Sequence, residues 1–332
     1  MINIDYSIGV TVIAFVVIAY CVMGGIKSVA ITDFIQMVLI LGGFFLAIPF
    51  AIRLCCNFPT ALKNIPYESL NLFKGISPAT IISLIIMYVA TFTVGQEVTS
   101  SIYSIRHAHD ATKALILSAF LIILFAFLPT FLGLISLSMA EIGYVDTSFM
   151  FQDGARYAFL NLVVNTMPPL IVSLVFVGIL SAIMSSADSD ILAAGTIFSN
   201  DIYKIHIDKG ADDDQVVKIT RLTIIMFGII AYLLALFNSG SIIIVLIFVF
   251  SLRAAGAFIP YVFGLYWSKS SAAGTIASLT FGCGSFIVLE IYKISVLGLQ
   301  SIIISLIVSL FCFIIFSKLF PPVINSLELA DD

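Results

Sequence analysis

The sequence predicts an all-α integral membrane protein. Apolar residues make up 61% of its 332 positions and charged residues 10%, against roughly 45–50% apolar residues in soluble domains. Nine apolar runs are long enough to cross a bilayer as helices, so we expect about nine transmembrane helices. In chain order, these runs cover residues 8–24, 33–52, 79–99, 114–137, 169–199, 217–237, 241–267, 272–292 and 298–320.

The distribution of lysine and arginine between the runs predicts the orientation. The first seven residues, MINIDYS, include no base, so we expect no signal peptide and an uncleaved first span. Most bases fall in connections on one side, which is cytoplasmic by the positive-inside rule. An odd number of spans then places Met1 outside and Asp332 inside, in a multi-pass plasma-membrane protein. The cytoplasmic bases are Lys27, Arg106, Lys113, Lys204, Lys209, Lys218, Arg221, Lys269 and Lys318.

Composition and motifs exclude several classes of function. The net charge of −4 is small and no basic patch occurs, so we expect no nucleic-acid partner. The three histidines lie in polar connections, and the sequence has no phosphate-binding loop or nucleophile motif, so we expect no enzyme. The five cysteines have no regular spacing, which argues against a disulfide framework or a zinc site.

The fifth run carries hydroxyl and carboxylate groups in the middle of a membrane span. At helical spacing Ser181, Ser185, Asp188 and Ser189 share one face, with Ser186 on its flank. Such groups are tolerated in a bilayer only toward a bundle interior or a watery cavity, and they typically mark an ion or substrate pathway. Their oxygens suit Na⁺, Ca²⁺ or Mg²⁺ rather than zinc, copper or iron. For the serines, close packing of small residues is the alternative.

Four passages occur together in this chain. One is Ser185-Ser186-Ala187-Asp188-Ser189 followed by Asn200-Asp201-Ile202-Tyr203-Lys204. The others are YCVMGGIKSVAITDFIQ (20–36), Gly95-Gln96 with the polar stretch to Lys113, and PYVFGLYWSKSSAAG (260–274). In combination they resemble the sodium:solute symporter family, which includes transporters of proline, pantothenate, sugars, choline and iodide.

The resemblance implies a leucine-transporter-type bundle of ten core helices in two inverted repeats of five. The whole chain, 1–332, would be one transmembrane domain. Residues 8–52 resemble core helices four and five, 79–267 resemble core helices six to ten, and 272–320 resemble peripheral helices. The first repeat is then incomplete, so we expect a truncated or mis-started chain that inserts but does not drive uptake alone. The missing N-terminal helices would come from an upstream reading frame or a second polypeptide.

The resemblance also implies a function, which is Na⁺-coupled symport of a small organic solute by alternating access. Na⁺ is the coupling ion, and the partners are the solute and membrane lipid. By this mapping, the Na⁺ ligands are the Ala182 carbonyl and the hydroxyls of Ser185 and Ser186. A second ion site, present in some members, would use Asp33, Asp188 and Ser189. Capping the N-terminus of an apolar helix explains Asp33 equally well.

The resemblance places substrate contacts on core helix six, where Tyr88, Thr91, Phe92 and Gln96 surround Gly95 and the helix is expected to be irregular. Ordinary bundle packing is the alternative for Tyr88, Phe92 and Gly95.

Arg253 departs from the family pattern, and a guanidinium inside a span needs a counterpart. Three hypotheses stay open: it pairs with Asp188 or Asp33, it binds an anionic substrate, or it extends toward a loop.

Two other functions remain as alternatives to symport. A symporter-like sensor module should continue into long cytoplasmic signalling helices, whereas this sequence ends about a dozen residues after Pro321-Pro322. A non-transporting remnant follows from the missing helices. The substrate itself is not predicted, because half of the pocket would come from those helices.

Overall fold

The computed structural model describes residues 5–57, 76–103, 105–141, 158–237, 242–294 and 300–322, and the elements in these ranges are helices. Within them, eight helices are long and apolar enough to span a membrane, or nine if one bent pair counts as a single span. The expected runs and the observed spans agree in order and position. Most of the two expected outside loops, 53–78 and 138–168, lies outside the described residues, although helix α6 (Ala158–Thr166) falls in the second.

The chain forms two compact units, and the first comprises Met1–Tyr67 and Ser104–Ser239. In this unit α1 packs along α7 and α8, and α5 packs on α1 and α6. A π-helix, η4, extends α7 and holds Asn200 to Lys204 of the signature passage. The other elements are α1 (Tyr6–Asn57), α5 (Ala108–Glu141), α7 (Pro169–Ile197), η4 (Phe198–Ile207) and α8 (Asp213–Phe237).

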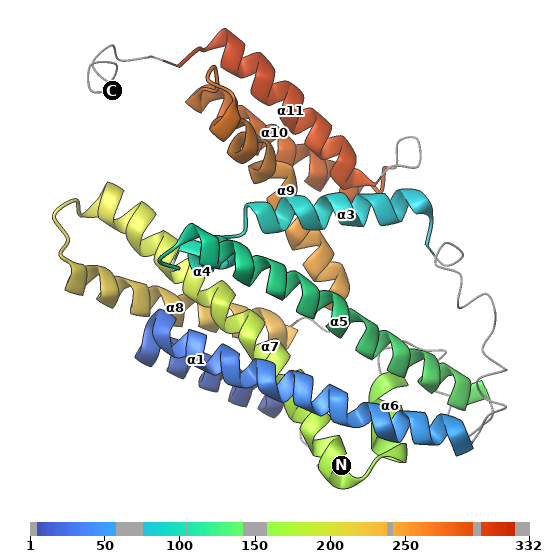
Figure 1. Cartoon of the computed structure of the whole chain (residues 1–332). Coiled ribbons are helices and arrows are strands. Elements are labelled where there is room, and N and C mark those ends of the chain that lie inside the picture. Colours follow the sequence, from blue (N-terminus) through green and yellow to red (C-terminus); the bar gives the residue numbers. More distant parts are fainter. Residues whose placement is uncertain are drawn as a thin grey trace. The chain divides into compact units, whose positions relative to one another are not determined.

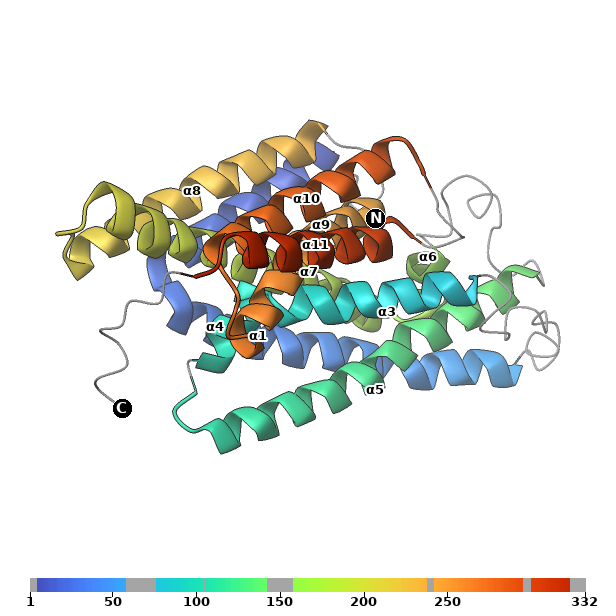
Figure 2. The same ribbon diagram turned by 90° about the horizontal axis from the view of Figure 1, so that it is seen from above.

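Helix α1 consists of two arms that meet at Gly25. This residue has φ 56° and ψ −155°, a conformation that is accessible to glycine and strained for other residues. The kink divides α1 into the spans Tyr6–Gly25 and Lys27–Leu54. The two arms diverge at the kink, and the first arm lies beside α8 (Figure 2). The expected runs 8–24 and 33–52 are therefore the two arms, and the second arm begins earlier than expected.

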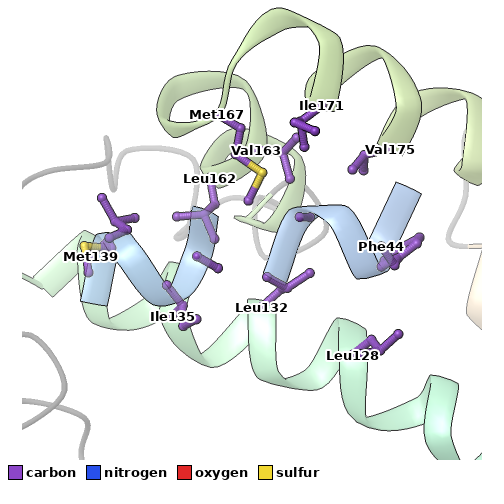
Figure 3. Close-up of a cluster of buried hydrophobic side chains, with 13 residues drawn as sticks. Phe44, Leu128, Leu132, Ile135, Met139, Leu162, Val163, Met167, Ile171 and Val175 are labelled. Atoms are coloured by element: carbon purple, nitrogen blue, oxygen red, sulfur yellow. The ribbon is translucent and has the colours of Figure 1, made fainter. Parts of the chain in front are cut away.

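The second arm of α1 is anchored in an apolar core shared with α5, α6 and α7 (Figure 3). Phe44 lies 5.1 Å from Phe125 in an edge-on contact and 5.4 Å from Phe159 in a stacked one, measured between ring centroids. Two glycines allow close approach of α1 and α7. A Cβ on Gly43 would lie 2.7 Å from the Leu174 carbonyl oxygen, and one on Gly178 would lie 3.3 Å from the backbone of α1. This packing fixes the register between the two helices.

The second unit comprises Glu68–Tyr103 and Gly240–Asp332. Helices α9, α10 and α11 pack against one another, and α3 packs on α9 (Figure 1). Met87 and Ala90 of α3 share a buried cluster with Ala254 and Ala255 of α9. The elements are α3 (Pro78–Thr93), α4 (Gln96–Tyr103), α9 (Ile242–Tyr266), α10 (Ala272–Ile291) and α11 (Ser301–Leu319).

The span that begins with α3 is broken. Helix α3 ends at Thr93, α4 begins at Gln96, and the two axes differ in direction by 47°. Val94 and Gly95 lie between them. The expectation of an irregular helix around Gly95 is confirmed.

Candidate ion and solute sites

The first unit holds an intramembrane group of polar side chains that we call the α1–α7 polar cluster: Tyr20, Asp33, Ser185, Asp188 and Ser189. Asp188 is fully buried. Its Oδ2 accepts a hydrogen bond from the Tyr20 hydroxyl at 2.6 Å, and its Oδ1 accepts one from the Ser189 hydroxyl at 3.3 Å. Asp188 of α7 is thus held by the first arm of α1.

Asp33 of the second arm faces the same helix. Its Oδ1 accepts a hydrogen bond from the Ser185 hydroxyl at 2.6 Å. The arm begins at Lys27, so Asp33 lies more than a turn inside it and does not cap its N-terminus. The capping hypothesis is wrong, because the kink at Gly25 starts the helix earlier than the Thr32-Asp33 pattern indicates. Ser185, expected at the first ion site, therefore contacts an acid expected at the second.

The other two expected Na⁺ ligands lie together on an exposed part of α7. The Ser186 hydroxyl donates to the Ala182 carbonyl oxygen at 3.2 Å. Both residues are exposed, whereas Ser181 on the same helix is buried. The carbonyl of Ala182 and the hydroxyls of Ser185 and Ser186 come from neighbouring positions within one helical turn, as the spacing predicts.

The charge of the cluster depends on its two carboxylates. Within the part of the chain that the structure describes, neither Asp33 nor Asp188 forms an ion pair with a lysine or arginine. Their partners are hydroxyl groups, which leave the charge of a carboxylate in place. Buried carboxylates are costly unless a cation meets them. The cluster offers hydroxyl and carboxylate oxygens, the donor set of a hard cation.

Tyr20 of the cluster and the nearby Gln36 were not among the site residues expected from the sequence. Gln36 of α1 lies one turn beyond Asp33 and is 8% exposed. Among the described residues, its buried Oε1 accepts no hydrogen bond. Tyr20 and Gln36 are the first and last residues of the 20–36 passage. Their positions in that passage could have identified them as candidate site residues. Only the structure shows that the Tyr20 hydroxyl contacts Asp188.

The second unit holds an ion pair at the break between α3 and α4. Arg253 of α9 donates through Nη1 to Oε1 of Glu97 at 2.5 Å. The side chains of Arg253 and Glu97 are 29% and 17% exposed, and the guanidinium carbon lies 5.9 Å from the centroid of the Phe250 ring. Within the second unit, the carboxylate partner of Arg253 is therefore Glu97. Sequence periodicity gave no signal for this pair, which joins helices 156 residues apart.

The expected solute residues on α3 divide into two groups. Tyr88 and Phe92 are both 44% exposed and form an aromatic group with Phe250, with centroids about 6 Å apart. Thr91 is fully buried, and its hydroxyl donates to the Phe250 carbonyl oxygen, which ties α3 to α9. Gln96 is the first residue of α4, directly after the break. The structure thus brings Tyr88, Phe92 and Arg253 around Phe250 and gives Thr91 a structural contact.

Comparison with known proteins matches residues 1–282 to the model of the sodium:solute symporter family. The chain belongs to the sodium:solute symporter family. It is 26% identical over 292 residues to the osmoregulated proline transporter OpuE of Bacillus subtilis, covering 86% of this chain and 57% of that protein. It is 28% identical over 288 residues to a sodium/proline symporter of Staphylococcus aureus, covering 84% of this chain and 55% of that protein.

A human relative is the high affinity choline transporter 1, which is 26% identical over 250 residues and covers 71% of this chain and 42% of that protein. The chain spans about half the length of these curated relatives. Their names describe transporters, as expected for a chain that is not an enzyme.

A solved structure also matches, the substrate-bound outward-open state of a Na⁺-coupled sialic acid symporter. The TM-score is 0.75 at 22% identity, and the match covers 97% of this chain and 68% of that one. This likeness, together with the described helices, confirms the predicted fold class, an all-α integral membrane protein of the leucine-transporter type. The multi-pass membrane location is confirmed as well.

Proposed function

We propose that this chain provides the ion and solute sites of a Na⁺-coupled symporter for a small organic solute. The observation that carries the proposal is the α1–α7 polar cluster, which keeps two carboxylates inside a span with hydroxyl partners. One relative is named as a proline transporter, another as a sodium/proline symporter, and the matched structure as a Na⁺-coupled sialic acid symporter. These names support the same function. Alternating access would then carry cation and solute together.

Two proposed cation positions on α1 and α7 are linked by the hydrogen bond from Ser185 to Asp33. The first uses the Ala182 carbonyl with the hydroxyls of Ser185 and Ser186, and the second uses Asp33, Asp188 and Ser189. The Ser185 hydroxyl donates a hydrogen bond to Asp33, so the lone pairs of its oxygen are free to face a cation on the other side. Occupation of one position therefore acts on the other through this hydrogen bond. Because Glu97 already neutralises Arg253, both carboxylates remain available to cations.

The solute position lies at the break between α3 and α4. We place Tyr88, Phe92, Gln96 and Arg253 at this position, with Thr91 holding α3 against α9. Broken helices in transporters bind solutes because their ends expose unpaired backbone groups. The proposed orientation has the N-terminus outside and the C-terminus in the cytoplasm, since the basic residues of the connections predict that direction.

The test measures solute binding by the purified full chain in lipid nanodiscs, with and without Na⁺. Radiolabelled proline, choline and sialic acid are suitable probes, since the relatives and the matched structure are named for them. We expect at least one solute to bind more tightly in Na⁺ than in an equal concentration of choline chloride or, for choline, potassium chloride. Binding that is indifferent to Na⁺ for all bound solutes would contradict the proposal.

A further inference from the structure

We propose that the Glu97–Arg253 pair selects zwitterionic solutes, with the solute carboxylate binding Arg253 and the solute ammonium binding Glu97. The inference rests on the proposed symport function and names the solute class of the same site. From the sequence, pairing with an acid, binding of an anionic substrate and extension toward a loop were all open for Arg253. The structure gives it an acidic partner, which changes the charge that the site presents.

The position of the pair distinguishes it from an ordinary structural ion pair. Glu97 lies in the first turn of α4, and its carboxylate folds back over Gly95 in the break. A Cβ on Gly95 would lie 2.8 Å from Oε1 of Glu97, the same oxygen that accepts from Arg253. Glycine at this position therefore leaves room for the ion pair to lie across the broken backbone. Both side chains keep part of their surface exposed, so a small solute can reach them.

The backbone at the break presents charges of both signs in the same place. The C-terminal end of α3 exposes carbonyl groups with partial negative charge, and the N-terminal end of α4 exposes amide groups with partial positive charge. Val94 and Gly95 separate these ends by only two residues. A solute with an ammonium and a carboxylate a few bonds apart matches this arrangement, whereas an ion of one sign matches half of it.

Charge balance argues against a simple anion at this site. An anion that takes Arg253 would leave Glu97 without its cation in a partly buried position, which is costly. A neutral solute would gain nothing from the pair. A zwitterion replaces one ion pair by two, because each protein charge receives a solute charge of opposite sign, and the net charge of the site stays at zero.

The apolar surroundings set the size of the solute and strengthen the charge selection. Tyr88 and Phe92 expose their rings beside Phe250, and Arg253 lies over the Phe250 ring. Aromatic surface lowers the local dielectric, so ionic contacts are stronger here than in water. It also offers a face for a compact aliphatic body attached to the two charged groups.

The experiment uses two matched series of solutes that differ in charge on one skeleton. The first is L-proline, L-prolinamide and N-acetyl-L-proline, and the second is L-alanine, L-alaninamide and N-acetyl-L-alanine. Each triplet contains a zwitterion, a cation and an anion. Binding of each to the full chain in nanodiscs is measured in Na⁺ by competition and direct titration. In at least one series, we expect the zwitterion to bind at least about tenfold more tightly than the cation and the anion of the same series.

Two isosteric variants then test the direction of selection. Glu97→Gln leaves Arg253 unpaired, so the preference should move toward the anion by about tenfold, and Arg253→Gln should move it toward the cation. Glu290→Gln and Lys293→Gln remove the same charges from the end of α10 elsewhere in this unit, and they should leave the preference unchanged.

Several outcomes would overturn the inference. The unaltered chain could prefer the anion or the cation, or it could bind no zwitterion in either series. The third such outcome is that both pair variants keep the charge preference of the unaltered chain. Na⁺ binding, followed separately with ²²Na⁺, distinguishes this failure from failure of symport. A chain that binds Na⁺ normally but does not discriminate solute charge refutes only the zwitterion assignment.

Discussion

The α1–α7 polar cluster and the Glu97–Arg253 pair balance intramembrane charge in opposite ways. In the cluster, Asp33 and Asp188 have hydroxyl partners, which do not neutralise a carboxylate. In the pair, a carboxylate meets a guanidinium and the charge cancels within the protein. The proposed ion site therefore needs a cation from solution to balance its carboxylates, whereas the pair needs none. From this contrast we expect Na⁺ to stabilise the first region and to leave the stability of the second unchanged.

Breaking the Glu97–Arg253 pair should cost the most stability. Arg253→Ala should lower the free energy of unfolding by about 3 kcal/mol, because it leaves Glu97 as a lone charge in a span. Adding Glu97→Gln should recover part of that loss, since both charges are then gone. The measurement is the melting temperature of the purified chain in detergent, at several Na⁺ concentrations, and the loss should be the same at each.

Arg221→Ala on the exposed surface of α8 is the matched control, and it should change the melting temperature little. If the double variant melted no higher than Arg253→Ala, the pair would not be the source of the loss. A loss that varied with Na⁺ would erase the contrast between the two regions.

A smaller effect is expected from the serine ligands in the cluster. Ser185→Ala and Ser186→Ala should each raise the Na⁺ concentration for half-maximal binding by about ten- to hundredfold, the cost of one lost ligand to a cation. The shift should be larger for Ser185, because its hydroxyl also bonds Asp33. The measurement is ²²Na⁺ binding to the chain in nanodiscs.

Ser173→Ala provides the control on the same helix, since its hydroxyl bonds only the Pro169 carbonyl among its described contacts. It should leave Na⁺ binding unchanged. Normal Na⁺ affinity in both Ser185→Ala and Ser186→Ala would remove these serines from the ion site.

The smallest effect should come from Tyr20→Phe, which removes one hydroxyl from Asp188. We expect a loss of about 1 kcal/mol in the free energy of unfolding without Na⁺, as for a typical hydrogen bond. The loss should shrink at saturating Na⁺, because the cation then supplies the charge contact that Asp188 lacks. Melting temperatures with and without Na⁺ measure this difference, with Tyr6→Phe on the exposed surface of the same arm as the control. An equal loss under both conditions would mean that Asp188 contacts no cation.

Much of the fold followed from the sequence, because membrane spans are specified by local composition. The apolar runs located the spans, and the 3.6-residue period placed Asp188 on the buried face of α7. The irregular helix that the family resemblance implied around Gly95 is the break between α3 and α4.

The contacts between helices did not follow. Periodicity gives the face of a residue but not the helix that it meets, so Glu97 was not recognised as the partner of Arg253. Asp33 was open to a capping role because the Thr32-Asp33 pattern resembles a helix start, whereas the backbone at Gly25 begins the arm two turns earlier. The assignments of individual ion and solute ligands stay predictions.

The glycine contacts between the second arm of α1 and α7 have a consequence for motion. Gly43 fits against the Leu174 carbonyl, and Gly178 fits against the backbone at Leu39 and Ile40, so each helix carries a notch that receives the other. If the helices slid by one residue, a residue with a side chain would replace each glycine, and its Cβ would approach the main chain of the other helix too closely. The packing therefore opposes sliding of the two helices. In the proposed transport cycle, Asp33 and Ser185 should therefore move together, and rotation should occur at Gly25 or outside this helix pair.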